Sequence, residues 1–153
     1  MVSLEEQLLA NSFEKVFMGA AGASGGGAKA VAVSHDKFPW VTAYSWDVDN
    51  GFGGKFTNPA TLPTGIGYAV DFSPDSSTIA VAHNVSPYVS AYPWSGSGFG
   101  TKYADPSGLA ASSGNGVNFS PDGSVIAVSH AGSPYVTAYP WSGSGFGTKF
   151  SNP

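Results

Sequence analysis

The stretch that decides the fold is SPYVTAYPWSGSGFGTKFSNP, residues 133–153. It occurs earlier with few changes as SPYVSAYPWSGSGFGTKYADP, residues 86–106, and in a more distant form as FPWVTAYSWDVDNGFGGKFTNP, residues 38–59. The second and third copies start 47 residues apart. A fixed period of this length indicates a repeat architecture, in which each copy forms one supersecondary unit.

The third copy shows the plan of one repeat. A β-branched and aromatic run, residues 117–120, precedes the turn PDGS, and residues 125–130 then alternate between two faces. After the turn AGSP, residues 135–141 alternate again, and the loop SGSGFG leads into a last short run, TKFS, at residues 148–151. Period-2 patterns bounded by Gly, Pro and Ser predict four short strands joined by hairpins.

Apolar residues occupy both faces of these predicted strands, so we expect each sheet to be covered on both sides. Radial stacking of four-stranded sheets achieves this cover, and the result is an all-β fold, the β-propeller. The repeats then define an N-terminal segment and three antiparallel blades: 1–18, 19–59, 60–106 and 107–153.

The first copy is irregular at its start. Its first strand is built either from the small residues Gly19–Lys29 or, if displaced, from Glu14–Ala20. Ahead of it, Ser3 and Glu6 match the capping box that often opens a helix. Apolar residues at helical spacing follow, so we expect a short helix over Leu4–Asn11.

Two of the hairpins resemble a known family. AVDFSPDSSTIAVAH, residues 69–83, and GVNFSPDGSVIAVSH, residues 116–130, are similar to the first hairpin of WD40-type blades. VTAYSWD, residues 41–47, resembles the end of the third strand that gives that family its Trp-Asp name. The later copies have Ser95 and Ser142 in place of the Asp, so the family's structural tetrad is not implied here.

A second resemblance covers more of the chain. The phrase in residues 133–153 is similar to repeats in tail-associated proteins of bacteriophages and prophages, and the similarity spans roughly residues 28–153. This resemblance implies a virion-associated structural or interaction protein.

Three blades are too few for a closed ring, because propellers typically have four to eight. An open wedge would expose two large apolar faces. Symmetric self-association is the simplest remedy: two chains would give six blades and three would give nine. We therefore expect a homo-oligomer, with a dimer favoured over a trimer.

The composition excludes several classes of function. The formal net charge is −4 and the sequence has no arginine, which disfavours nucleic acid as a partner. The absence of cysteine excludes disulfides and thiolate metal sites. The first residues lack the basic and apolar pattern of a signal peptide, and no run of residues is apolar enough to span a membrane. We expect no membrane partner.

No motif in the sequence predicts catalysis, a metal site or a cofactor. His35, His83 and His130 recur once per copy, and a ring spreads them too far apart for metal ligation. We expect their ring nitrogens to hydrogen bond between blades or to a turn. GASGG, residues 22–26, matches a nucleophile-elbow spacing but lacks the strand and helix around it. DVDNG, residues 47–51, reads as a hairpin turn rather than a calcium loop.

Repeated aromatic residues are the remaining candidates for ligand binding. Packing between blades explains most of them, but a ring left exposed at the rim could stack on a sugar or anchor a protein partner. Two hypotheses follow: a self-assembling, non-enzymatic structural module, or a lectin-like binder with one shallow site per blade. The candidate ligand-binding residues are Tyr88, Trp94, Phe99, Tyr135, Trp141 and Phe146.

Overall fold

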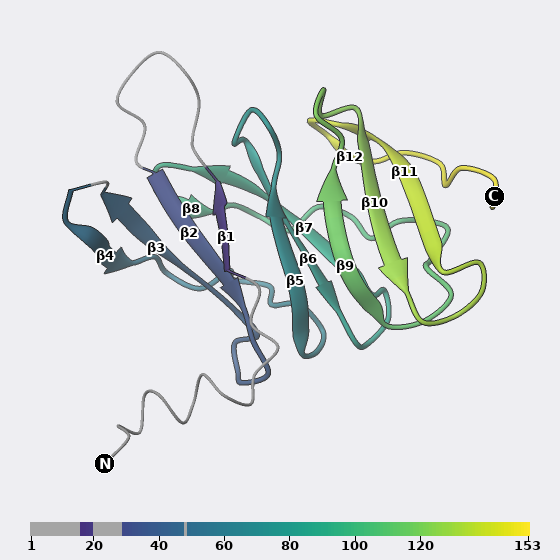
Figure 1. Ribbon diagram of the computed structural model, residues 1–153, viewed down its shortest axis with the longest axis horizontal. Helices are drawn as coiled ribbons and strands as arrows, with labels where there is room; N and C mark the ends of the chain where they lie inside the picture. Colours follow the sequence, from purple (N-terminus) through teal and green to yellow (C-terminus); the bar gives the residue numbers. More distant parts are fainter. Residues whose placement is uncertain (1–15, 20–28, 48) are drawn as a thin grey trace.

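A computed structural model describes residues 16–19, 29–47 and 49–153. In this part of the chain the strands form three antiparallel sheets of four strands each, and no helix is present (Figure 1). The expected all-β fold with four-stranded antiparallel sheets is therefore confirmed. The described residues include no helix that could cross a membrane.

Each sheet contains four consecutive strands, and we number the sheets as blades in chain order. Blade 1 consists of β1 (Val16–Gly19), β2 (Lys29–Ser34), β3 (Val41–Asp47) and β4 (Gly51–Lys55). Blade 2 consists of β5 (Gly67–Phe72), β6 (Thr78–His83), β7 (Val89–Ser95) and β8 (Gly98–Phe99). Blade 3 consists of β9 (Gly114–Phe119), β10 (Val125–His130), β11 (Val136–Ser142) and β12 (Gly145–Phe146).

The first strand of blade 1 is the displaced alternative. β1 pairs with β2 from Val16 opposite Val33 to Gly19 opposite Ala30. Val16 and Phe17 are residue types that favour strands, whereas the glycine-rich stretch after them is not. The sheet thus begins at Val16, three residues before the boundary expected at residue 19. The predicted helix over Leu4–Asn11 lies outside the described residues.

The fourth strand differs from the prediction in the later blades. TKFS, residues 148–151, is not a strand; the partner of β11 is instead the two-residue β12, directly after the turn. Pro140 lacks the N–H that a longer ladder would need. In blade 1, where Ser45 stands at this position, β4 extends over five residues. The two blades with proline at this point of the third strand thus have the two-residue fourth strand.

The blades pack through two unlike faces. One face of each blade, which we call the small-residue face, contacts the large apolar side chains on the aromatic face of the next blade. Between blades 1 and 2 the small residues are Ala30, Ala32, Val41 and Ala43, and the large ones are Val70, Phe72, Ile79, Val81, Tyr92 and Trp94. Between blades 2 and 3 the small residues are Ala69, Ala80, Ala82, Val89 and Ala91, and the large ones are Val117, Ile126, Val128, Tyr139 and Trp141.

The first strands of the blades lie against one another. β5 contacts β1 and β2 of the preceding blade and β9 of the following one. In Figure 1 the blades follow in order from blade 1 in blue to blade 3 in green and yellow. A succession of four-stranded sheets with contacting first strands is the arrangement of blades in a propeller.

Candidate functional site

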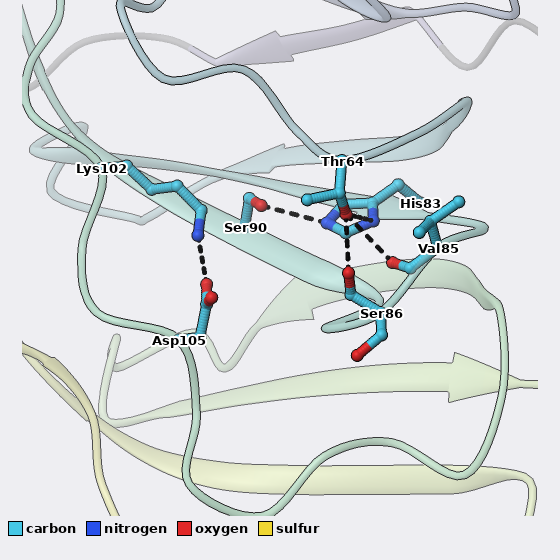
Figure 2. Close-up of polar contacts among 7 residues, drawn as sticks. All are labelled: Thr64, His83, Val85, Ser86, Ser90, Lys102 and Asp105. Carbon is cyan, nitrogen blue, oxygen red and sulfur yellow. Dashed lines mark hydrogen bonds and ion pairs between the residues drawn. The ribbon is translucent and has the colours of Figure 1, made fainter.

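The buried His83 lies at the centre of a polar network, shown in Figure 2. Its Nε2 lies 3.0 Å from the Ser90 hydroxyl on β7, and its Nδ1 lies 3.4 Å from the Thr64 hydroxyl in the segment between blades 1 and 2. Thr64 donates its own proton to the Ser86 carbonyl at 2.9 Å. The hydroxyl of Thr64 can then only accept from Nδ1–H, so Nε2 accepts from Ser90. The network joins two strands of blade 2 to the linker before it.

The pair of His83 and Ser90 resembles a catalytic base and its nucleophile, but a substrate could not reach either side chain. His83 and Ser90 are both fully buried. Burial lowers the pKa of His83 to about 4, so the ring stays neutral. Among the described residues no carboxylate is hydrogen-bonded to it; Asp105 instead pairs with Lys102, beside the network (Figure 2). The geometry fits a structural histidine.

The other two histidines occupy the same place in their blades. His130 Nε2 lies 2.9 Å from the Thr137 hydroxyl on the adjacent strand, and its Nδ1 is buried. His35, in blade 1, is only half-buried. In the described residues no three His, Asp or Glu side chains lie close enough to hold a metal ion. For His83 and His130, the main contact is therefore within the blade rather than between blades.

Four of the six candidate aromatic residues belong to the packing between and within blades. Trp94 and Trp141 are buried, and Phe99 and Phe146 are half-buried. The structure brings them together in pairs: Trp94 and Phe99 make an edge contact at 5.1 Å, and Trp141 and Phe146 make the same contact at 5.0 Å. These rings stabilise the hairpin between the third and fourth strands.

Tyr88 and Tyr135 lie at the other end of the third strand, away from those rings. Both follow a proline and have positive φ, 71° and 70°. Tyr88 packs against the apolar core between blades 2 and 3, whereas Tyr135 is 65% exposed. The six predicted residues therefore do not form one site per blade, and Tyr135 is the one whose ring is largely open to solvent.

A cleft that the sequence did not reveal lies between the first hairpins of blades 2 and 3. Its volume is about 360 Å³. Asp75 and Asp122 occupy equivalent turns on its lining, together with the indole of Trp141. The hydroxyl groups of Ser73 and Ser120 each donate to the aspartate of the same turn at 2.6 Å. These contacts lower the pKa of both carboxyl groups, that of Asp122 to about 2, so both are charged at neutral pH.

Of the two remaining motifs, DVDNG and GASGG, the structure describes only DVDNG, except for its residue 48. The carboxylate of Asp47 accepts the backbone N–H groups of Asp49 and Asn50 at 3.0 and 2.8 Å, which closes the hairpin between β3 and β4. Asp47 and residues 49–51 thus form the expected hairpin turn. The GASGG stretch at residues 22–26 lies outside the described residues.

The small-residue face of blade 3 is open, unlike the same face of blade 2. Val89 on β7 is fully buried, whereas Val136 at the same position of β11 is 38% exposed. Asp71 is buried and accepts the Phe119 N–H across the blade boundary at 2.8 Å, whereas Asn118 at the same position of blade 3 is exposed. No described residue covers this face as a further blade would.

The aromatic face of blade 1 is also incompletely covered. Tyr44 and Trp46 are only half-buried, although their equivalents in blade 2, Tyr92 and Trp94, are buried. Phe52, next to Trp46, is 63% exposed. The two ends of the blade series thus present the two unlike halves of the contact that joins the blades internally.

The comparisons with known proteins concern the fold alone. No family model matches the sequence, and a search of curated proteins finds no match. A solved structure described as the Dos1 propeller is similar, with a TM-score of 0.50 and 12% sequence identity over 90% of this chain. The chain has a β-propeller-like fold. The match covers 34% of the Dos1 propeller chain, so this protein spans about a third of its length.

Proposed function

We propose that this protein is a non-enzymatic structural and interaction module, in which two chains associate into a ring of about six blades. The observation that carries the proposal is the pair of open, unlike faces at the two ends of the blade series. The open face of blade 3 is similar to the buried small-residue face of blade 2: Ala127, Val136 and Ala138 correspond to Ala80, Val89 and Ala91. Gly116 and Ser129 stand in place of Ala69 and Ala82, so this face is also built from small residues. A surface that is buried wherever a neighbour exists is expected to bind the same kind of neighbour.

The wider role rests on resemblance. Residues 28–153 resemble repeats of bacteriophage and prophage tail-associated proteins, which favours a part in assembly or display on a virion. The buried state of the His83 and Ser90 pair supports the non-enzymatic half of the proposal, because no substrate could reach the hydroxyl. A net charge of −4 without arginine argues for a protein or glycan partner rather than nucleic acid.

The mass of the native particle tests the proposal directly. Light scattering after size exclusion should give a mass near twice 15.6 kDa. A stable species of one chain at all concentrations would contradict the self-associating ring. A trimer would contain nine blades and would have to close as a wider ring.

A glycan-binding function is the second candidate, and the cleft beside Trp141 favours it. Asp75 and Asp122 keep charged oxygens on its lining, where they can accept hydrogen bonds from sugar hydroxyls. Trp141, although largely buried, also lines the cleft and is close enough for its fluorescence to report a bound sugar. Titration with simple sugars should quench or shift tryptophan fluorescence, and Asp122→Asn should weaken the response. Asp36→Asn, an exposed carboxylate elsewhere, is the matched control. A flat titration with every sugar would exclude this candidate.

A further inference from the structure

A joint between an aromatic ring, a glycine and a tryptophan recurs where blades meet. Phe56 follows β4 of blade 1 and makes an edge contact with Trp94 of blade 2, with centroids 5.0 Å apart. Gly98, in the last hairpin of blade 2, lies under the same ring: a Cβ added there would be 3.3 Å from Phe56 Cδ1. With a positive φ of 107°, Gly98 also suits the turn. The glycine leaves a slot that the aromatic ring of the preceding blade fills.

The second joint repeats the first. Tyr103 of blade 2 contacts Trp141 of blade 3 at 5.3 Å between centroids. A Cβ added at Gly145 would lie 3.6 Å from the Tyr103 ring. The Tyr103 hydroxyl also donates to the Gly143 carbonyl at 3.0 Å, which ties the ring to the same hairpin. Two independent joints thus share one geometry.

The residues for a third joint are present in the chain, but they lie at its two opposite ends. Phe150 corresponds to Phe56 and Tyr103, and its ring is 48% exposed. Gly51, with φ of 78°, precedes Phe52 as Gly98 precedes Phe99, and nothing lies within 4 Å of a Cβ built on it. Trp46 contacts Phe52 of its own blade at 5.1 Å, and in the described part of the chain no ring from another blade contacts it.

The backbone already holds Phe150 in the position that the joint requires. In all three blades the N–H of this aromatic residue donates to the carbonyl of an alanine on the third strand. The distances are 2.8 Å for Phe56 to Ala43, 2.9 Å for Tyr103 to Ala91 and 3.0 Å for Phe150 to Ala138. The backbone of Phe150 is therefore held against its own blade in the same way as that of Phe56 and Tyr103.

We propose that Phe150 of one chain occupies the slot formed by Gly51 and Trp46 of a second copy of this chain. The inference rests on the self-association proposed above and specifies the contact through which it occurs. The third joint then has the geometry of the two internal ones, and the open face of blade 3 covers the aromatic face of the partner's blade 1. The pairing is head to tail, and two copies close it into a ring when the rotation allows.

A face-to-face pairing of two identical ends fits the observations less well. Blade 3 against blade 3 would place two small-residue faces together and leave both copies of Phe150 without a glycine slot. Blade 1 against blade 1 would oppose two sets of half-buried aromatic residues and leave Phe150 exposed. The small-residue face of blade 3 can meet an aromatic face only when it packs against blade 1 of the other chain.

Cysteine cross-linking tests the joint, because the chain has no cysteine of its own. A Phe150→Cys chain is mixed with a Gly51→Cys chain, and the mixture is oxidised with glutathione disulfide. The matched control is Phe56→Cys with Gly98→Cys in one chain, where the added Cβ lies 3.4 Å from Phe56 Cβ, close to the ~3.8 Å of a disulfide. The control should form an internal bond without a change in mass.

The expected result is a disulfide-linked pair that contains one chain of each kind, formed far more readily in the mixture than in either chain alone. Light scattering before oxidation separates the possible failures. A dimer that yields no mixed disulfide, while the internal control closes, would overturn this joint and leave self-association standing. A wild-type chain that stays monomeric at all concentrations would overturn both.

A second variant avoids any added cysteine. Phe150→Ala should weaken association about tenfold, since an edge contact between rings contributes at this level. Leu109→Ala removes an equally exposed apolar side chain outside the joint and should leave the mass unchanged. Equal effects of the two substitutions would contradict a specific role for Phe150.

Discussion

His83 makes the stability of the fold depend on pH. Its ring is neutral and buried, with a pKa lowered to about 4, whereas an exposed histidine in the unfolded chain titrates near 6.5. Between these values the unfolded state binds more protons than the folded state, so stability falls as the pH falls. The difference corresponds to about 3 kcal/mol of unfolding free energy, fully present above pH 6.5 and lost by about pH 4.

We predict that His83→Gln flattens the decline in stability between pH 7 and pH 4. The measurement is the free energy of unfolding in urea at a series of pH values. Gln at this position has no titrating ring, although its amide can still bond Ser90. His35→Gln is the matched control, because it changes the equivalent but half-buried residue and keeps His83. Parallel pH profiles for wild type and His83→Gln would refute the linkage.

The recurrence of the histidines could be predicted from the sequence, but their partners could not. Spacing alone placed one histidine at the end of each second strand, at His83 and His130. The bond from His83 to Thr64 depends on the path of a linker that has no periodic pattern. In blade 3 the residue equivalent to Thr64 is Ala111, so the same histidine has a different surrounding.

The glycines that open β5 and β9 let neighbouring blades approach at the backbone. A Cβ on Gly67 would lie 2.3 Å from the Trp40 carbonyl oxygen, and one on Gly114 would lie 2.4 Å from that of Tyr88. Both distances are shorter than van der Waals contact with a backbone atom allows. The first strands of blades 2 and 3 therefore need glycine at this point to contact the preceding blade.

We predict that Gly67→Ala lowers the free energy of unfolding by about 1–3 kcal/mol, the cost of overpacking a site whose neighbour is backbone. Gly96→Ala is the matched control: nothing lies within 4 Å of an added Cβ at this hairpin position. It should change stability by less than about 0.5 kcal/mol. Chemical denaturation of both variants makes the comparison. Similar values for the two would mean that blades 1 and 2 are not in this close contact.

Strand patterns were predictable for the second and third strands and less so for the first and fourth. Alternation in residues 125–130 matches β10, and that in residues 135–141 matches β11 to within one residue. TKFS has the composition of a strand but follows Pro140, which interrupts the ladder. The repeat pattern is lost at the first strand of blade 1. Only the pairing of β1 with β2 in the folded chain shows that the strand comes from Glu14–Ala20 rather than from Gly19–Lys29.

The arrangement of the blades determines which repeated residues are exposed, and the sequence cannot show this. Residues 86–106 and 133–153 are nearly identical, yet Val89 is fully buried and Val136 is 38% exposed. The difference comes from the neighbour on one side, not from the residues themselves. The cleft between blades 2 and 3 escaped prediction for the same reason, since Asp75 and Asp122 meet only when two blades are side by side.

This difference between equivalent valines gives a test of the assembled particle. Val89→Asp would place an unpaired charge in the boundary between blades 2 and 3 and should unfold the chain, at a cost of more than about 4 kcal/mol. Val136→Asp makes the same chemical change on the open face. We predict that it lowers the stability of a single chain by less than about 1 kcal/mol. It should also reduce the native mass to 15.6 kDa, because the partner's blade 1 can no longer cover that face.

Circular dichroism and light scattering on the two variants separate folding from association. A folded Val136→Asp that keeps the mass of two chains would mean that blade 3 does not carry the interface. Loss of folding in both variants alike would mean that Val136 is as essential to a single chain as Val89, and that its exposure does not mark a contact between copies. A folded monomer for Val136→Asp, beside an unfolded Val89→Asp, is the outcome expected if one contact joins the blades within each chain and again joins the two chains at both boundaries between them.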